Sequence, residues 1–454
     1  MSARLSCCVD VPSEAAGLVR YGLEELLRGL GLAPAWTRRG DARLTIRLDA
    51  VEEGLDLRLG PEAVDALVRP TPPVRMAEVE IDGERWPLPA SGPEAGPEAG
   101  DGDLVASAAW WLAGLQEHAT AERDAHGRFP FAASLQARLG EAPGGPLRPA
   151  VDAYRRRLGD VLRAAGVEVL GQTWGGAPWA VALTHDLDAL RTRRLRALAG
   201  DLLRRRPVSA VRRALGPDLR RRSVADLRAL ADRLGVRATY FAKPGAWAPE
   251  DANAPLGPSE AALLRSLAAD GHEVGWHPGY GAHDRADRLG AEHARLTEAV
   301  GHAPALARTH FLRWTEPQTP RLLAEAGVRI DSTLGFSAHE GFRRGTSHPF
   351  RIYDRDADRP ADLWEMPLAV MDTTLFTHRG LGPEAAAEAL AQAFEAARLG
   401  GGCAVVLWHN DLGEGAPWSE RLPVLEQALR QARDDGAAVG ALGALRDVWC
   451  SPEP

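Results

Sequence analysis

The sequence has few cysteines and almost no lysine. The four cysteines, Cys7, Cys8, Cys403 and Cys450, lack the spacing of a zinc site or a disulfide framework, and the first two are too close for an ordinary bridge. We therefore expect reduced thiols in a cytoplasmic protein. Lys243 is the one lysine of the chain, so arginine supplies almost all of the positive charge. This bias looks like the result of GC-rich coding and is weak as a guide to function.

Long apolar runs and an excess of positive charge are absent as well. No stretch approaches the ~20 consecutive apolar residues that a membrane helix needs. The first residues have neither the basic nor the apolar region of a secretory signal. The formal net charge is −8, which makes the protein a poor candidate for binding nucleic acid. We expect no membrane span, no nucleic-acid partner and no export.

The composition divides the 454 residues into two expected domains. Residues 1–170 mix amphipathic helical stretches with short runs of period two, which predicts a smaller α+β domain of unknown function. Within it, residues 87–103 contain Gly-Pro-Glu-Ala twice and have almost nothing to bury, so we expect a disordered loop there. Residues 171–454 form the larger second domain.

The larger domain alternates short apolar runs with longer helical segments. About eight such units are typical of an α/β barrel, complete or irregular, and barrel enzymes carry their chemistry at the carboxyl ends of the strands. The expected strands are residues 180–184, 236–242, 273–276, 305–310, 328–331, 363–370, 404–408 and 437–442.

A basic segment interrupts this pattern. Residues 191–222 contain twelve arginines against two aspartates, on an amphipathic background. A solvated helical insertion after the first strand is one interpretation. A docking patch for an anionic partner, such as a phosphate-bearing substrate or a lipid surface, is the other.

Acidic and imidazole side chains follow two of the expected strands. Asp186 and Asp188 come after the strand at 180–184, and carboxylates two residues apart point to the same side of a strand. Such a pair is tolerated where a cation or a proton offsets its charge, although Asp residues also cap helices that follow strands. His277 follows the strand at 273–276, where an imidazole is either a zinc ligand or a hydrogen-bonding group of the loop.

Basic side chains follow two further strands. Arg308 can hold a catalytic carboxylate in its ionised form through a charge-assisted hydrogen bond. His409 comes directly after a very apolar strand, where it is either a proton donor to a leaving group or a buried packing residue. Glu365 and Asp372 are second candidates, with structural hydrogen bonding as the alternative.

Four motifs carry a family resemblance. They are Thr-His-Asp-x-Asp at 184–188, His-Glu-x-Gly-x-His-Pro-x-Tyr at 272–280, Arg-x-His-x-Leu-Arg at 308–313 and Asp-Ser-Thr-Leu-Gly-Phe at 331–336. Together they resemble the polysaccharide deacetylase family, carbohydrate esterase family 4 with the chitooligosaccharide deacetylases. The match is closer to a bacterial subgroup that has an N-terminal domain of unknown function. The resemblance covers most of the chain after residue 100.

The resemblance implies a distorted (β/α) barrel and a metal-dependent hydrolase that removes the acetyl group of an N-acetylated sugar or polysaccharide precursor. It implies that Asp186 is the general base and Arg308 the residue that orients it, with His409 as the general acid. Asp188 and His277 would bind a divalent metal, with zinc as the expected ion.

One position departs from the family pattern. Members place a second histidine ligand four residues after the first, and Gly281 stands there. We expect His283 to serve as the third ligand, with His310 or a water molecule as alternatives. The residues expected to bind the substrate are Tyr280, His310, Trp314, Asp331 and Glu365.

Three functions remain open on these residues. The first is a metal-dependent deacetylase whose substrate is an N-acetylated saccharide or an intracellular precursor. The second is a catalytically inactive barrel that binds saccharide, which Gly281 favours. The third is the hydrolysis of an amide or imide that is not a sugar.

Overall fold

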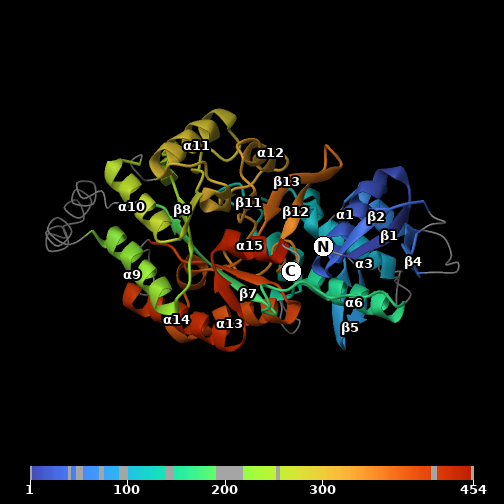
Figure 1. Cartoon of the computed structure of the whole chain (residues 1–454). Helices are drawn as coiled ribbons and strands as arrows, with labels where there is room; N and C mark the ends of the chain where they lie inside the picture. The colour runs from blue at the N-terminus through green and yellow to red at the C-terminus, as the bar shows by residue number, and fades with distance from the viewer. Residues whose placement is uncertain are drawn as a thin grey trace.

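The structure is a computed structural model of the whole chain (Figure 1). It describes residues 3–38, 42–47, 55–70, 76–91, 101–139, 147–190, 218–251, 256–410 and 417–450. Most of the loop that we expect to be disordered (92–100) and most of the basic segment (191–217) lie outside these residues.

The first part of the chain contains a small parallel sheet. β1 (Ala3–Asp10) pairs with β2 (Leu32–Trp36) on one side and with β3 (Leu44–Arg47) on the other. β4 (Leu55–Arg58) extends the sheet beyond β3. Burial alternates along the middle of β1, as expected for a strand with one face on the core.

Helices and a hairpin complete this part, drawn in blue to cyan in Figure 1. The longer helices α1 and α3 pack on each other and on α6. The elements are α1 (Ser13–Gly29), α2 (Pro61–Val68), the antiparallel pair β5 (Ala77–Ile81) and β6 (Glu84–Leu88), α3 (Asp101–Leu112), α4 (Leu115–Ala119), α5 (Leu135–Arg138) and α6 (Ala150–Ala164).

The second part is a curled and mostly parallel sheet. Its order is β12-β13-β11-β10-β9-β8-β7-β15-β14, with β16 also paired to β7, and only β12 with β13 is antiparallel. The strands are β7 (Ala180–Leu187), β8 (Thr239–Ala242), β9 (Glu273–Trp276), β10 (Leu306–Ala307), β11 (Ile330–Asp331), β12 (Phe350–Asp354), β13 (Arg359–Glu365), β14 (Leu368–Met371), β15 (Cys403–Leu407) and β16 (Ala438–Gly440).

One short stretch of chain connects the two sides of this curled sheet. β13 pairs with β11, while β14, which begins three residues after β13 ends, pairs with β15. Residues 359–371 therefore join the two sides of the curled sheet and turn it into a distorted barrel. The predicted fold class is confirmed, with the single expected strand at 363–370 divided into two because Met366 and Pro367 lie between them.

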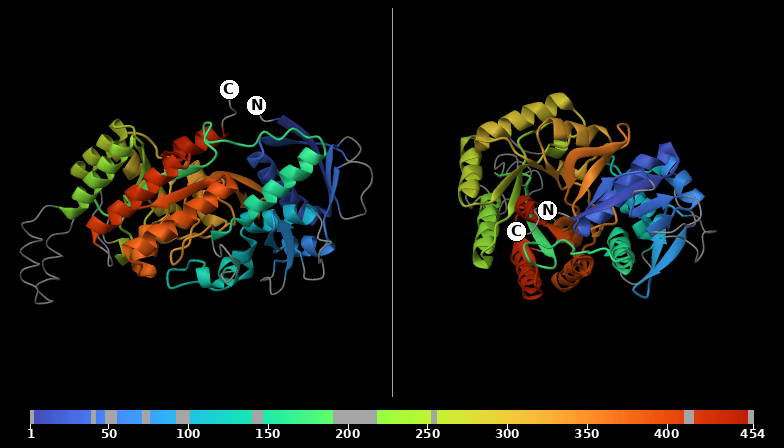
Figure 2. Two further views of the ribbon diagram at one scale, coloured as in Figure 1. Left: turned by 90° about the horizontal axis from the view of Figure 1, so that it is seen from below. Right: turned by 45° about the vertical axis from the view of Figure 1, so that its right-hand side comes forward.

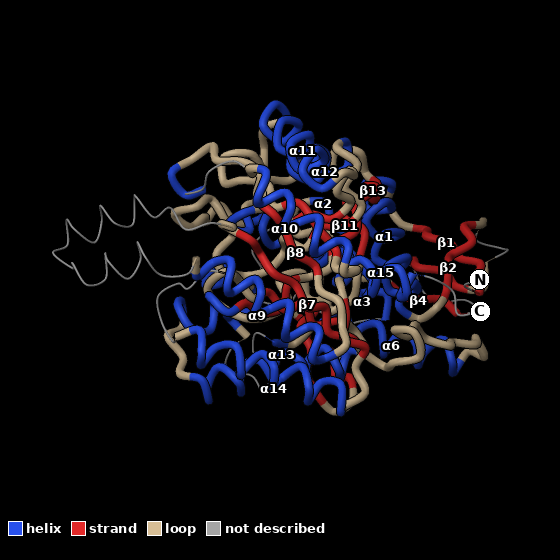
Figure 3. The backbone as a smooth tube through the Cα atoms, turned by 60° about the vertical axis from the view of Figure 1, so that its left-hand side comes forward, coloured by secondary structure: helices blue, strands red, loops and turns tan. Residues whose placement is uncertain are grey.

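Helices surround the barrel strands (Figure 3). Their amphipathic faces bury leucine and alanine side chains against the sheet, and Gly235, Gly301 and Gly401 follow three of them with positive φ, as is common where a helix ends. The helices are α9 (Leu219–Leu234), α10 (Pro258–Ala269), α11 (Ala286–Val300), α12 (Gln318–Glu325), α13 (Pro383–Gly400), α14 (Trp418–Asp434) and α15 (Leu442–Cys450).

Buried ion pairs join the two parts of the chain, which lie side by side in both views of Figure 2. Glu117 of α4 accepts hydrogen bonds from Nε and Nη2 of Arg343 at 2.9 and 2.5 Å. Arg344 lies 3.3 Å from Glu117 and 2.6 Å from Glu316. The boundary near residue 170 stays a prediction, because these contacts make the parts continuous.

None of the helices within the described ranges is both long enough and apolar enough to span a lipid bilayer.

Candidate active site

The carboxyl ends of the barrel strands bring polar side chains together. Asp188 follows β7 by one residue, and Lys243 and His277 come directly after β8 and β9. His310 lies three residues beyond β10, and His409 two residues beyond β15. Because neighbouring parallel strands end at the same edge of a sheet, residues far apart in the sequence meet there.

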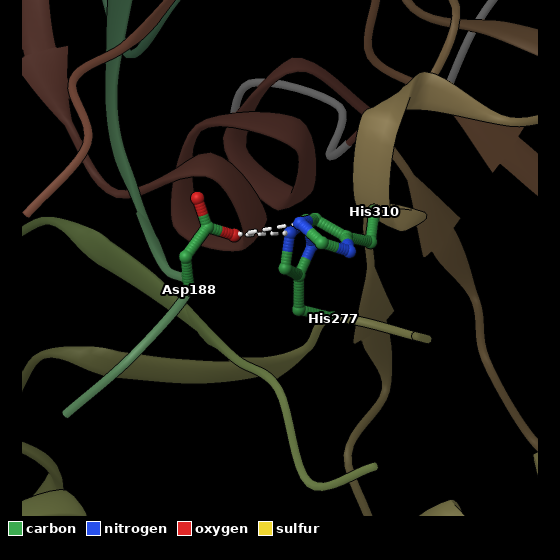
Figure 4. Close-up of side chains that lie close together, drawn as sticks. All are labelled: Asp188, His277 and His310. Carbon is green, nitrogen blue, oxygen red and sulfur yellow. Dashed lines mark ion pairs between the residues drawn. The ribbon is translucent and has the colours of Figure 1, made fainter. Parts of the chain in front are cut away.

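Asp188, His277 and His310 form a group that could hold a metal ion (Figure 4). Oδ1 of Asp188 lies 3.3 Å from Nε2 of His277 and 3.2 Å from Nε2 of His310. Ligand atoms of a tetrahedral zinc ion are separated by roughly 3.3 Å when each lies about 2.0–2.1 Å from the metal. The two separations therefore fit a divalent ion without rearrangement of these side chains.

The other ring nitrogen of each histidine is engaged. Nδ1 of His277 lies 2.5 Å from the carbonyl oxygen of Arg308, and Nδ1 of His310 lies 3.0 Å from Oδ1 of Asp251. Because each Nδ1 can donate its proton to an oxygen, each Nε2 keeps its lone pair for a metal. Oδ1 of Asp188 is buried and accepts no hydrogen bond, as expected for an atom that binds an ion.

Positive charge surrounds Asp188. Burial opposes its ionisation, but the charges of His310, when protonated, and of Lys243 lower the pKa of Asp188 well below its usual range. Nζ of Lys243 lies 3.9 Å from Asp188 Oδ1. Burial lowers the pKa of Lys243 below its ordinary value, although the charges of Asp188 and Asp251 oppose this shift. The carboxylate is therefore ionised and available as a ligand.

Asp186 is held by Arg308. Nη1 of Arg308 lies 3.1 Å from Oδ1 of Asp186 and donates to the hydroxyl of Thr184 at 2.8 Å. The guanidinium is fully buried, and its remaining N–H groups donate to the carbonyl and hydroxyl oxygens of Ser332. Oδ2 of Asp186 lies 3.7 Å from His277 Nε2, so the second carboxylate borders the metal group without belonging to it.

His409 pairs with Asp372 at the end of β15, the strand next to β7. Nδ1 of His409 lies 2.6 Å from Oδ1 of the fully buried Asp372. Burial alone would lower the pKa of His409, but the negative charge of Asp372 raises it to about 10. The imidazole is therefore protonated at neutral pH, and its side chain is 13% exposed, which leaves it accessible to a substrate.

The structure does not bring His283 into the metal group. Nδ1 of His283 lies 3.6 Å from Asp284 and its Nε2 lies 3.3 Å from the hydroxyl of Thr315. Gly281 supplies no second ligand, and a Cβ atom there would lie 2.8 Å from Nη1 of Arg288, the mobile end of a long side chain. His310, which the sequence predicts as a substrate-binding residue and as an alternative ligand, occupies the third position of the group instead.

The residues that the sequence predicts to bind the substrate differ in how deeply they are buried. Tyr280 is half-buried at the rim, where its hydroxyl lies 3.2 Å from Nδ1 of His126, a residue of the first part of the chain. The indole nitrogen of Trp314 donates to Glu316 at 2.9 Å. Asp331 and Glu365 are fully buried below the site, where Asp331 accepts from Thr333 at 2.9 Å.

Two residues of the site, Lys243 and Asp251, escape the sequence reasoning. Lys243 directly follows an expected strand, but the sequence distinguishes it only as the one lysine of the chain and not as a residue of a site. Asp251 fixes His310 and also accepts from the backbone N–H of Tyr280 at 2.7 Å, and no pattern around it signals this role. Asp372 is a second candidate in the sequence, and its pairing with His409 depends on tertiary structure.

Phe311, beside His310, has an unusual backbone. Its φ is 63° and that of Leu312 is 56°, both in the left-handed region that non-glycine residues rarely adopt. Such conformations cluster at functional sites, where the surrounding packing maintains them. The turn directs the chain after β10 so that His310 faces Asp188.

No protein-family model and no curated protein matches the chain. Among solved structures it is similar to a Mycobacterium smegmatis protein described as a polysaccharide deacetylase, with 22% identity over 60% of this chain and 91% of that one and a TM-score of 0.45. It is also similar to an allantoinase (17% identity, 61% and 92% covered, TM-score 0.43). A pseudoenzyme of carbohydrate esterase family 4 from Bacillus anthracis is a further neighbour (11% identity, 59% and 66% covered, TM-score 0.34). The family that the motifs resemble is thus among these neighbours, and identities this low say nothing about the reaction.

Proposed function

We propose that this protein is a metal-dependent hydrolase that removes the acetyl group of an N-acetylated sugar or polysaccharide precursor. The observation that carries the proposal is the convergence of Asp188 with the Nε2 atoms of His277 and His310. Two imidazoles and one carboxylate, with a further position open, is the ligand set of many catalytic zinc sites. Zinc is therefore the ion that we propose.

Asp188, His277 and His310 would hold a divalent ion, which would supply a water molecule of lowered pKa and a Lewis acid for the acetyl carbonyl. Asp186 is the general base that takes a proton from the attacking water, because its carboxylate borders the metal group. Arg308 holds this carboxylate in place through the hydrogen bond from its Nη1. His409 is protonated and accessible, and it donates a proton to the departing amine nitrogen.

The substrate class and the location are parts of the same proposal. The four motifs that resemble polysaccharide deacetylases support an acetylated saccharide, and Tyr280 at the rim offers a ring against which a sugar can stack. The absence of a disulfide at Cys7 and Cys403, among the described residues, fits a reducing compartment. An acetylated saccharide precursor that is linked to a nucleotide or a lipid and made inside the cell fits both the substrate class and the compartment.

A catalytically inactive, saccharide-binding barrel is the second candidate. The observation that favours it is Gly281, which stands at the position where the family pattern has a histidine. Metal content separates the candidates, because a silent barrel has no need of an ion in the Asp188 group.

The test uses the full chain purified after growth with zinc. We expect about one equivalent of zinc by mass spectrometry and release of acetate from N-acetylhexosamine donors, with small cyclic amides as the comparison substrates. Asp188→Ala should lose both the metal and the activity, and Asp287→Ala on the exposed face of α11 is the matched control. Less than ~0.2 equivalents of zinc, with no recovery on reconstitution, would contradict the hydrolase proposal.

A further inference from the structure

Lys243 lies inside the candidate metal centre. Its side chain is 1% exposed, and Nζ lies 3.2 Å from Nε2 of His310. Nζ is also 3.9 Å from Oδ1 of Asp188 and 4.0 Å from Oδ1 of Asp251. Lysine is rarely buried unless it is paired, so these contacts explain why the one lysine of the chain is enclosed at this point.

Nε2 of His310 has a single lone pair. Because Nδ1 of His310 lies 3.0 Å from Asp251, which accepts its proton, the lone pair is on Nε2. Nζ of Lys243 is almost equidistant from the two ring nitrogens, 3.2 Å from Nε2 and 3.3 Å from Nδ1, so it lies against the ring and its conflict with a metal ion is one of charge. A divalent ion at an ordinary distance from Nε2 would lie within about 5 Å of the ammonium nitrogen, where the two positive charges repel.

The carboxylates around Nζ explain why a cation is stable there. Asp251 is fully buried, and Oδ1 of Asp188 is buried as well. Buried carboxylates need an opposite charge. The ammonium group of Lys243 supplies that charge from within the chain, and a divalent ion would supply more of it.

We propose that Lys243 is a built-in counterion of the metal centre, which engages His310 and balances Asp188 until a metal ion displaces it. This inference rests on the metal site of the proposed function. It follows that the wild-type protein binds metal more weakly than the same three ligands would without the lysine. It also follows that removal of the metal costs the wild-type protein little stability, because the lysine takes its place.

The experiment measures zinc and cobalt affinity of the full chain by calorimetry with chelator competition, at one fixed pH. Lys243→Met keeps the length of the side chain and removes its charge, so we expect a dissociation constant at least tenfold smaller than that of the wild type. Lys243→Gln is the second neutral variant and should show the same change. Melting temperatures in chelator and in zinc give an independent readout, and the increase on adding zinc should be larger for both variants.

Two controls accompany these variants. Arg155→Met removes another buried cation, which pairs with Asp152 at 3.0 Å in α6, and should leave the metal affinity unchanged. Lys243→Met combined with Asp188→Ala should bind metal weakly, which confirms that the added affinity belongs to the centre.

Each result decides the inference. A tenfold gain in Lys243→Met that depends on Asp188 supports it, even if no variant releases acetate, in which case only the proposed function fails. Equal or weaker binding by both neutral variants overturns the inference and leaves the hydrolase proposal standing if the wild type binds zinc through Asp188. Absence of metal binding in every variant overturns both. If neither neutral variant folds, a zinc-soaked wild-type crystal decides, because Nζ must then lie beyond hydrogen-bond distance of His310.

Discussion

Nδ1 of His409 lies 2.6 Å from Oδ1 of Asp372, although 37 residues separate the two in the chain. β14 ends immediately before Asp372 and β15 ends two residues before His409, so the pairing of these two strands brings the side chains together. The negative charge of Asp372 raises the pKa of His409 to about 10, which keeps the imidazole protonated at neutral pH. A proton donor is thus present at the barrel mouth.

This ion pair predicts how activity changes with pH. The general acid must be protonated, so kcat/KM should fall as pH rises through the pKa of His409. Asp372→Asn removes the charge that raises this pKa, and the high-pH limb of the profile should move to lower pH by more than about one unit. A profile recorded from about pH 6 to 10 measures the shift. An unchanged limb would mean that His409 is not the acid.

Asp186→Asn separates catalysis from metal binding. The asparagine side chain has nearly the size of aspartate and still forms hydrogen bonds, but it cannot take a proton from water. We expect kcat to fall by about 10²–10⁴-fold with zinc content unchanged. Mass spectrometry and an acetate assay on the same sample give both quantities. Full activity in this variant would exclude Asp186 as the base.

Matched histidine variants decide the third metal ligand. His310→Ala removes an Nε2 atom that lies 3.2 Å from Asp188 Oδ1, so zinc affinity should fall by about 100-fold or more. His283→Ala should leave zinc affinity unchanged, because His283 contacts Asp284 and Thr315 instead. Calorimetric titration of both variants tests the pair. Loss of zinc in His283→Ala alone would restore the ligand expected from the sequence.

The buried pair of Asp331 and Glu365 predicts a stability change. Burial raises the pKa of Asp331 to about 6 and, together with the charge of Asp331, raises the pKa of Glu365 well above its usual range. A carboxyl group whose pKa is raised in the folded protein stabilises the fold fully below its pKa in the unfolded chain, about 4.3 for glutamate. This stabilisation is lost as pH rises through the pKa of the group in the folded protein. Glu365→Gln removes the contribution of Glu365, so stability should decline less between about pH 5 and 8 than in the wild type.

Thermal melts at several pH values check this prediction, with Glu384→Gln on the exposed face of α13 as the control. The glutamine can still accept from the backbone N–H of Leu334, which lies 2.8 Å from Glu365 Oε1. Parallel decline of Glu365→Gln and the wild type would contradict the raised pKa of Glu365.

Glu117 predicts that the barrel depends on the first part of the chain. Its carboxylate accepts two hydrogen bonds from the buried Arg343. Glu117→Ala leaves the guanidinium of Arg343 without its carboxylate partner, while Arg344 keeps Glu316 at 2.6 Å, and breaking such a buried pair costs about 3–5 kcal/mol. Urea denaturation measures the loss, and Glu122→Ala on the exposed surface is the comparison. A loss below about 1 kcal/mol would show that the pair contributes little.

The α/β class, most strands of the barrel and five candidate site residues could be proposed from the sequence alone. Apolar runs followed by polar residues predict strand ends, and parallel strand ends converge whatever lies between them. That is why Asp186, Asp188, His277, Arg308 and His409 could be proposed from spacing and motif resemblance. The short pairing of β10, only Leu306–Ala307, was not predictable, because the hydrophobic run there continues beyond the paired residues.

What the amino-acid order determined is the set of strand tips and the chemical types that they carry. Tertiary structure alone decided that His310 rather than His283 faces Asp188, and that Lys243 lies beside them. Both depend on the directions of side chains after the strands end, where backbone turns such as that at Phe311 and contacts to distant residues such as Asp251 set the geometry. Such positions follow no regular period in the sequence. The sequence therefore does not predict which of these side chains face one another, and the closed barrel decides it.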